Sequence, residues 1–204
     1  VGESAHSRDV AAGTTFCSEG DEPRSFFVIR TGTVKLTQLS PEGHQVVLRL
    51  IHSGEAFGGV AGLGGGAYPV TAEAVTDASV LEWPGEVMAR LMERHPKLAL
   101  NAVRFVAARL HELQVQYRQL ATEKVERRIA RALIRLVEQA GRRVDTGVLI
   151  DLPLSRDDIA QMTGTTLFTV SRIVSRWEGD GLLEAGRQRI VIRDPHALMS
   201  IADD

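Results

Sequence analysis

Short segments of alternating apolar and polar residues follow one another through the first eighty residues, separated by turns that contain glycine. Short strands at even spacing are typical of an antiparallel sandwich or roll and not of a parallel sheet. We therefore expect an antiparallel β-roll of the jelly-roll type in this half of the chain. The segments with a strand pattern are Thr14 to Ser18, Ser25 to Arg30, Val34 to Leu39, Gln45 to Ile51 and Val70 to Trp83.

Six glycines gather between residues 58 and 66, where few side chains are present. Such a segment either brings bare backbone close to a ligand or is mobile, and the pattern leaves both interpretations open.

After Pro84 the apolar residues take a helical spacing, which strengthens from Pro96 to Leu120. Seven of them recur at alternating intervals of four and three, which is a heptad seam. A second stripe, formed by Leu98, Ala102 and Phe105, can pack on the roll. The seam residues are Ala99, Val103, Val106, Leu110, Leu113, Tyr117 and Leu120.

A strict heptad seam drifts away from any straight contact with a core, so it suits pairing with a second helix. We expect a two-fold homodimer whose interface holds the six seam residues from Val103 to Leu120. The alternative is a core helix that packs only within its own chain. A further amphipathic helix is expected from Glu123 to Ala140, with its arginines outward and a hinge at the Thr122–Glu123 junction.

Two short helices separated by glycine are predicted near the end of the chain. Ser155 and Asp158 form a capping-box pattern at the start of the first helix. Gly164 supplies the left-handed residue of a tight turn, and Thr166 can cap a second helix that runs to about Gly179. The apolar stripe of that second helix consists of Val170, Ile173, Val174 and Trp177.

Two alternating segments follow, Leu182 to Ala185 and Arg189 to Ile192, around a basic turn at Gly186-Arg187-Gln188. They predict a wing of two strands. Asp194 and Pro195 then predict a last short helix, because a capping residue precedes a proline at the first helical position. The whole segment has the pattern of a winged helix-turn-helix, so double-stranded DNA is the expected partner.

The polar face of the second helix carries side chains that can contact bases and phosphates. Arg172 can bond guanine O6 and N7 in a bidentate manner, and Phe168 can touch a thymine methyl group. Side chains near helix starts and in the wing are better placed for phosphates. The candidate DNA-binding residues are Phe168, Ser171, Arg172, Ser175, Thr166, Thr169, Arg176, Ser155, Arg156, Arg187 and Gln188.

The charge and the cysteine content limit the possible sources of DNA affinity and the possible cofactors. From Ala121 onward there are 13 Lys and Arg against 13 Asp and Glu, so DNA affinity depends on the local placement of arginines. The single cysteine, Cys17, excludes an internal disulfide and a cysteine-ligated iron–sulfur cluster within one chain. No stretch has the length of a membrane span and no secretory signal is visible, so a cytoplasmic protein is expected. Because the chain begins with Val1, a preceding segment can be missing.

Taken together, the motifs resemble those of the cyclic-AMP receptor protein and fumarate-nitrate reductase regulator (CRP/FNR) family over nearly the whole chain. The resemblance implies a homodimeric transcription regulator that binds a palindromic operator, is controlled by a small effector and contacts RNA polymerase. The residues that carry it are Gly20-Asp21, Gly32-Thr33-Val34-Lys35-Leu36, Gly54-Glu55-Ala56-Phe57-Gly58 and Thr169-Val170-Ser171-Arg172.

The chain departs from the family pattern at the effector site. The family's acidic residue is matched by Gly59, its phosphate-binding Arg-Ser pair by Tyr68-Pro69, and its adenine-contacting Thr-Ser pair by Leu113-Gln114. Without a cation at Tyr68, cyclic AMP in the usual pose is not expected. The haem ligands of related sensors would fall at Gly58 and Val60, which cannot supply them. The resemblance implies an apolar pocket lined by Gly58, Gly59, Val60, Tyr68, Pro69, Val70, Thr71, Leu113 and Tyr117.

The reading helix departs as well, because Phe168 stands where most members carry a glutamate that accepts from cytosine. Arg172 persists, so a guanine contact is expected without the cytosine contact. We expect Phe168 to favour a thymine methyl group or to pack against the turn.

These observations predict an α+β chain with three parts. They are a cyclic-nucleotide-binding-like β-roll that senses the effector (1–96), a long dimerisation helix (97–121) and a winged helix-turn-helix (122–204). One alternative is a regulator with constitutive, effector-independent DNA affinity. Another is a cupin-like metal-dependent enzyme, which His44, His52 and Glu55 fit poorly because no His-x-His pair is present.

Overall fold

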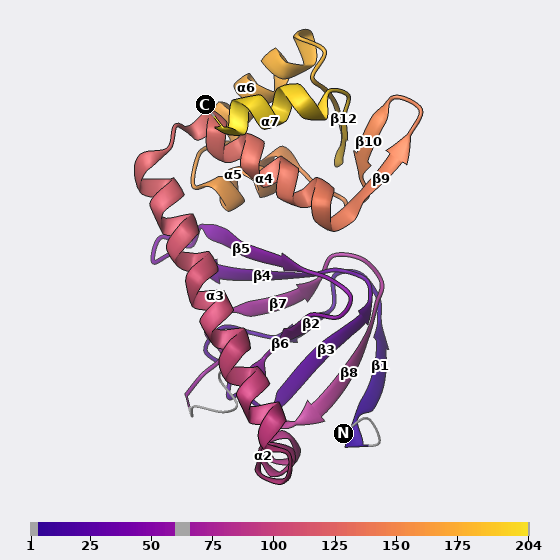
Figure 1. Cartoon of the computed structure of the whole chain (residues 1–204), viewed down its shortest axis with the longest axis vertical. Coiled ribbons are helices and arrows are strands. Elements are labelled where there is room, and N and C mark those ends of the chain that lie inside the picture. Colours follow the sequence, from indigo (N-terminus) through magenta and orange to yellow (C-terminus); the bar gives the residue numbers. More distant parts are fainter. Residues whose placement is uncertain (1–3, 60–65, 204) are drawn as a thin grey trace. The chain divides into compact units, whose positions relative to one another are not determined.

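A computed structural model describes residues 4–59 and 66–203 of the chain (Figure 1). By its internal contacts the chain divides into two compact units, Val1–Gln114 and Val115–Asp204. Helix α3 (Pro96–Thr122) belongs to both units and covers the span predicted for the long helix. The three-part division with boundaries at residues 96 and 121 stays a prediction.

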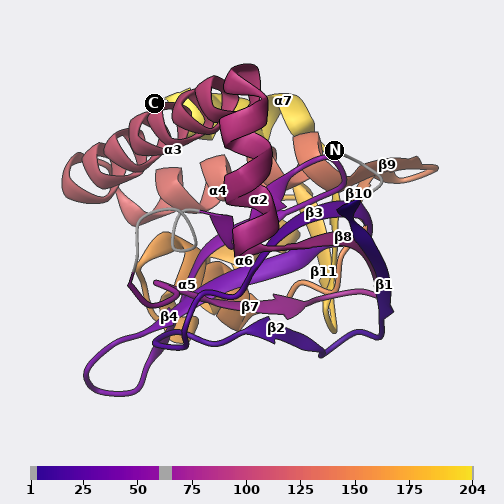
Figure 2. The same ribbon diagram turned by 90° about the horizontal axis from the view of Figure 1, so that it is seen from below.

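The described part of the first unit contains two four-stranded antiparallel sheets, which confirms the predicted roll (Figure 2). In spatial order, the first sheet consists of β1 (His6–Val10), β8 (Ala78–Pro84), β3 (Ser25–Thr31) and β6 (Ala56–Phe57). The second consists of β2 (Thr15–Cys17), β7 (Thr71–Ala74), β4 (Val34–Leu39) and β5 (Gln45–Ile51). Helix α2 (Gly85–Arg94) follows β8 directly.

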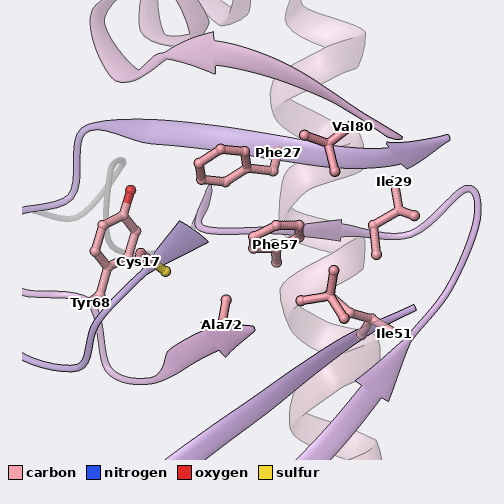
Figure 3. Close-up of a cluster of buried hydrophobic side chains, with 9 residues drawn as sticks. Cys17, Phe27, Ile29, Ile51, Phe57, Tyr68, Ala72 and Val80 are labelled. Atoms are coloured by element: carbon pink, nitrogen blue, oxygen red, sulfur yellow. The ribbon is translucent and has the colours of Figure 1, made fainter. Parts of the chain in front are cut away.

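The core of the roll lies between the two sheets, because both contribute side chains to one buried cluster (Figure 3). Phe27 and Phe57 stack with ring centroids 4.7 Å apart, and Phe16 meets both rings edge-on. Burying one large apolar side chain contributes about 2 kcal/mol, so this cluster is a main source of the unit's stability. The buried members are Cys17, Phe27, Ile29, Val34, Ile51, Phe57, Tyr68, Ala72 and Val80.

Three features of the roll differ from the sequence prediction, of which one is that the short strand β6 lies outside the predicted segments. The segment from Val70 to Trp83 forms two strands, β7 and β8, and not one. Strand β1 was not predicted, because His6–Val10 is polar and mostly exposed and has no apolar alternation. It is a strand because it pairs with β8 along its whole length.

The second unit is a winged helix-turn-helix, as the sequence predicted. Its helices are α4 (Val125–Ala140), α5 (Arg156–Thr163), α6 (Leu167–Gly179) and α7 (Pro195–Asp203). Its sheet runs in the order β11 (Leu183–Gly186), β12 (Arg189–Ile192), β10 (Gly147–Ile150) and β9 (Gly141–Val144). The β9–β10 hairpin was not predicted, and it extends the two-stranded wing to four strands.

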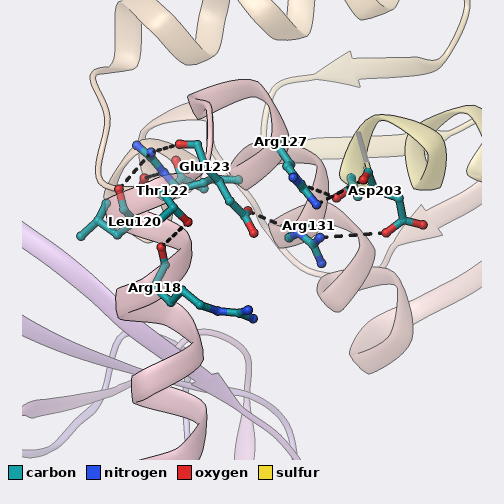
Figure 4. A network of polar contacts seen from close by, with 10 residues as sticks. Arg118, Leu120, Thr122, Glu123, Arg127, Arg131 and Asp203 are labelled. Carbon is teal, nitrogen blue, oxygen red and sulfur yellow. Dashed lines mark hydrogen bonds and ion pairs between the residues drawn. The ribbon is translucent and has the colours of Figure 1, made fainter.

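The arginines of α4 do not point outward as predicted. Arg127 donates to the carbonyls of Ala202 and Asp203 at the end of α7, and Arg131 pairs with Glu123 (Figure 4). Arg128 donates to Glu123 O at 2.8 Å and to Thr163 O at 3.0 Å. Arg127 and Arg128 therefore bind backbone carbonyls at the carboxyl ends of neighbouring helices, where carbonyl groups lack intrahelical partners.

Within residues 4–59 and 66–203, no helix combines the length and apolar character needed to cross a membrane.

Candidate nucleic-acid interface

The helix-turn-helix is built by two capped helices joined at Gly164. Ser155 Oγ accepts from the amide of Asp158 at 3.0 Å, and Asp158 Oδ2 accepts from the amide of Ser155 at 2.9 Å. This reciprocal pair is the predicted capping box, and it fixes where α5 begins. Gly164 has φ 62° and ψ 47°, the left-handed conformation that the sequence predicted for the turn. Thr166 then caps α6 by accepting from the amide of Thr169 at 3.2 Å.

Helix α6 has one buried face, which fixes its orientation in the unit. The four residues of the predicted apolar stripe are all at most 6% exposed: Val170, Ile173, Val174 and Trp177. In addition, the indole Nε1 of Trp177 donates to Glu126 Oε1 at 3.1 Å. The opposite face is therefore held outward.

Most of the predicted reading residues share that outward face. Arg172 and Ser175 are exposed and Ser171 is half-buried. Phe168 is 77% exposed, so it does not pack against the turn. Leu167, which is 50% exposed, lies at the edge of this face, four residues before Ser171, and the sequence prediction missed it.

Two of the predicted phosphate-binding arginines make ion pairs within the unit. Arg176 pairs with Glu126 of α4, and Arg156 pairs with Glu178 at 3.0 Å and donates to Ser175 Oγ at 3.3 Å. Arg172 lies beside the first pair, in a groove of about 440 Å³ between α4 and α6. The contact of Arg156 and Arg176 with phosphates stays a prediction.

The wing is joined to α6 by the same Glu178. Its second carboxylate oxygen accepts from the amide of Ala185 in β11 at 2.9 Å. At the wing tip, Arg187 and Gln188 are exposed, and Gln188 has φ 55°. The sequence contained no sign of this bridge, because Arg156, Glu178 and Ala185 meet only through the fold.

The residues predicted to line an effector pocket differ in burial and in hydrogen bonding, and their role as a pocket stays a prediction. Tyr68 is 5% exposed, lies in the roll core and bonds through its hydroxyl to the backbone of Ser25. A Cβ atom added at Gly58 would lie 2.6 Å from Ser25 O, and one at Gly59 2.5 Å from the Phe26 ring. These two glycines therefore allow close packing against β3 and do not form an open cradle.

The other predicted pocket residues differ in their surroundings. The carbonyl of Pro69 accepts from Gln38, and the hydroxyl of Thr71 accepts from the amide of Glu19. Val70 is half-buried, whereas Leu113 and Tyr117 are exposed on α3, and Val60 lies outside the described residues.

A cavity of about 330 Å³ does occur in the first unit, between the roll and α3. None of the described pocket residues named above lines it. Its charged side chains form two ion pairs, Arg49 with Glu55 and Arg109 with Glu112. It is thus more polar than the predicted pocket, and its charges are balanced.

The histidines named for a metal site do not gather. His52 Nδ1 lies 3.0 Å from Thr33 Oγ1, and His44 is exposed. Within the described ranges, no three His, Cys, Asp or Glu side chains are arranged to hold a metal ion.

Comparison with known proteins agrees with this architecture. A cyclic nucleotide-binding domain model matches residues 7–95, and a Crp-like helix-turn-helix domain model matches residues 127–201. The chain is 29% identical to the transcriptional activator protein FnrA of Stutzerimonas stutzeri, over 96% of this chain and 80% of that protein. It is 27% identical to the fumarate and nitrate reduction regulatory protein of Escherichia coli K12, over 96% of this chain and 78% of that protein.

Solved structures agree over the whole length as well. A CRP-family transcriptional regulator of Thermus thermophilus superposes with a TM-score of 0.84 at 27% identity, covering 97% of both chains. A second regulator from that organism, of the CRP/FNR family, has a TM-score of 0.83 at 25% identity and covers 98% of this chain and 99% of its own. With a sensor-type roll and a winged helix-turn-helix in the same order, the chain belongs to the CRP/FNR family of DNA-binding transcription regulators.

Proposed function

We propose that this regulator acts as a homodimer on a palindromic operator, with one α6 in the major groove of each half-site. The observation that carries the proposal is the outward face of α6, which is capped at its start and anchored by its buried stripe. Recognition helices of this class read bases from such a face.

Each predicted contact has a distinct role in this proposal. Arg172 reads a guanine, with Ser171 and Ser175 beside it as adaptable hydrogen-bonding groups. Contacts to phosphates fix the register of the protein on DNA and carry no sequence information. The phosphate-contacting residues are Thr166, Thr169, Ser155, Arg156, Arg176, Arg187 and Gln188.

The exposed seam of α3 supports the homodimer. All six predicted interface residues are between 42% and 74% exposed in the single chain: Val103, Val106, Leu110, Leu113, Tyr117 and Leu120. A row of exposed apolar side chains at heptad spacing is typical of a helix that pairs with a twin.

For regulation, we infer an effector other than cyclic AMP in its usual pose, and RNA polymerase as the protein partner on the promoter. Tyr68 occupies the position of the family's phosphate-binding arginine, and its side chain is neutral and committed to the core. A cyclic phosphate would therefore have no cation to pair with at that position.

The test is selection of bound sequences from a random duplex pool by the purified protein, at stated salt and without added ligand. A two-fold symmetric motif with half-sites about one helical turn apart is expected. Enrichment of an asymmetric motif, or of none even in cell extract, would contradict the proposal.

Two arginine variants test the assignment of the reading face. Arg172→Ala should weaken operator binding by about 1 to 3 kcal/mol and relax the preference at one base pair per half-site. Arg176→Ala should weaken binding to all sequences alike, and the slope of log affinity against log salt concentration should fall in magnitude by about one. Equal behaviour of the two variants in titrations on operator and random duplexes would show that the face is wrongly assigned.

A regulator with constitutive DNA affinity is the second candidate. The balanced ion pairs of the cavity in the first unit favour it, since they leave no unpaired charge for an anionic effector. Purified protein that binds its operator fully without additives, and gains nothing from cell extract, would support this candidate over effector control.

A further inference from the structure

The first turn of α6 carries two exposed apolar side chains that the core does not use. Phe168 is 77% exposed and Leu167 is 50% exposed, whereas the four stripe residues of the same helix are at most 6% exposed. We call these two exposed side chains of the first turn the apolar patch, and exposed apolar groups of this kind mark contact sites in folded proteins.

Phe168 lies on the same face as the main base-reading candidate, and Leu167 lies at the edge of that face. Phe168 precedes Arg172 by four residues and Leu167 precedes Ser171 by four, so each pair is adjacent on the helix surface. The first turn contains no acidic residue, and the side chain of Thr166 caps it. The outward face is therefore apolar in its first turn and hydrogen-bonding in its second.

In the major groove, thymine presents a methyl group at the position where cytosine has only hydrogen. An apolar first turn gains from burying that methyl group and cannot bond the donors and acceptors of the other bases. We propose that Leu167 and Phe168 make this regulator select thymine by its methyl group, which rests on the proposed binding of α6 in the major groove.

The helix geometry places this thymine relative to the guanine. Four residues of α-helix rise about 6 Å, and base pairs are stacked about 3.4 Å apart. The thymine read by Phe168 should therefore lie within about two base pairs of the guanine read by Arg172.

The test replaces thymine by uracil, which removes only the methyl group, at one symmetric pair of operator positions at a time. Burying one such carbon group is worth about fourfold in Kd, so one symmetric pair should cost about fifteenfold. Phe168→Ala should raise the Kd for the thymine duplex by a similar factor, and replacing thymine by uracil should not raise the Kd of this variant further. Phe168→Glu should move the selected base from thymine toward cytosine, because a carboxylate accepts from cytosine N4.

Two controls make the result specific. Met199→Ala removes an apolar side chain of similar exposure from α7, at 48%, and should keep both the affinity and the response to uracil. The salt slope of Phe168→Ala should equal that of the unchanged protein, since no phosphate contact is removed.

The proposal is wrong if every uracil replacement leaves the Kd of the unchanged protein within twofold. It is also wrong if Phe168→Ala binds more weakly than the unchanged protein by the same factor on the thymine duplex and on the uracil duplex. Loss of affinity for a protein partner with unchanged operator binding would likewise assign the patch to that partner. In both cases binding of the symmetric operator would leave the proposed function in place. If no duplex is bound at all, the proposed function and this inference fail together.

Discussion

At the scale of single residues, two arginines of α4, Arg127 and Arg128, act by binding backbone carbonyls, whereas many other arginines form ion pairs. Arg128 is the clearest case, because one guanidinium contacts the loop after α3, through Glu123 O, and the last turn of α5, through Thr163 O. Carbonyls at helix ends have no intrahelical partner, so this single side chain satisfies two of them at once. Arg128 thereby ties the start of α4 to the helix-turn-helix.

Replacing Arg128 by Ala should lower the free energy of unfolding of the second unit by about 2 to 3 kcal/mol, because charged hydrogen bonds to carbonyls are lost. Urea denaturation followed by the fluorescence of Trp177, in a Trp83→Phe background, would measure the change. Arg143→Ala is the matched control, since Arg143 is exposed in β9 and should contribute little. Equal losses in the two variants would contradict this role of Arg128.

Cys17 makes a prediction about pH. Burial raises the pKa of its thiol to about 11, with Asp21 nearby adding to the shift. Since the pKa of an unfolded thiol is about 8.5, the unfolded chain loses this proton first as pH rises. The resulting stability is fully present below pH 8.5 and is lost progressively as pH rises toward 11.

The free energy of unfolding should therefore fall with pH between 9 and 11 more steeply in the unchanged protein than in Cys17→Ala. One proton corresponds to a difference of at most about 1.4 kcal/mol per pH unit. Alkylation of Cys17 at pH 8 should also be slow in the folded protein and fast in urea. Parallel pH profiles for the two proteins would show that the buried thiol does not carry this linkage.

At the scale of elements, the turn between α5 and α6 depends on one glycine. At φ 62° a residue with a side chain is strained, and a Cβ atom added at Gly164 would also lie 2.8 Å from Leu120 Cδ1. The Leu120 side chain is half exposed and can move, so the backbone is the larger obstacle. The turn angle of the helix-turn-helix is therefore set by Gly164.

Gly164→Ala should destabilise the second unit by about 1 to 2 kcal/mol, measured by the same denaturation of Trp177 fluorescence. Gly164→Asn should lose less, because Asn tolerates the left-handed region. Gly179→Ala, in the last turn of α6 with open space around it, should be neutral or stabilising. A Gly164→Ala variant as stable as Gly179→Ala would mean that the turn tolerates a side chain.

The sequence predicted elements well where local chemistry decides them. The caps at Ser155 and Thr166 and the turn at Gly164 depend on residues close together in the chain, and all three are confirmed. Strand β1 depends on β8, which is far along the chain, and it has no alternation that reveals a strand. The β9–β10 hairpin is a local pairing that lacks this alternation as well, and β10 has a distant partner only in β12.

The features of the candidate site also fall into those that local sequence predicts and those that depend on tertiary contacts. The outward face of α6 follows from helical periodicity alone, so its residues could be named in advance. The pairing of Arg156 with Glu178, and the packing of Gly58 and Gly59 against β3, arise from tertiary contacts that no local pattern encodes.

At the scale of the whole molecule, the exposed seam of α3 predicts the assembly. Leu110 is 58% exposed, so Leu110→Glu should cost the single chain little stability but should place two carboxylates in the dimer interface. We expect sedimentation velocity to show a dimer for the unchanged protein and a monomer for the variant, with weaker operator binding. Leu39→Glu, at 62% exposure in β4, should remain dimeric. A monomeric unchanged protein at micromolar concentration would contradict the assembly.

The Glu178 bridge has a consequence for the thermodynamics of recognition. Because one carboxylate holds both Arg156 and the amide of Ala185, the wing and the reading helix are already ordered with respect to each other in the free protein. Ordering two loose segments at the moment of binding would cost conformational entropy, and preorganisation removes that cost. The affinity of this regulator for DNA can therefore come from a modest number of contacts, which suits a DNA-binding segment whose charges sum to zero from Ala121 onward.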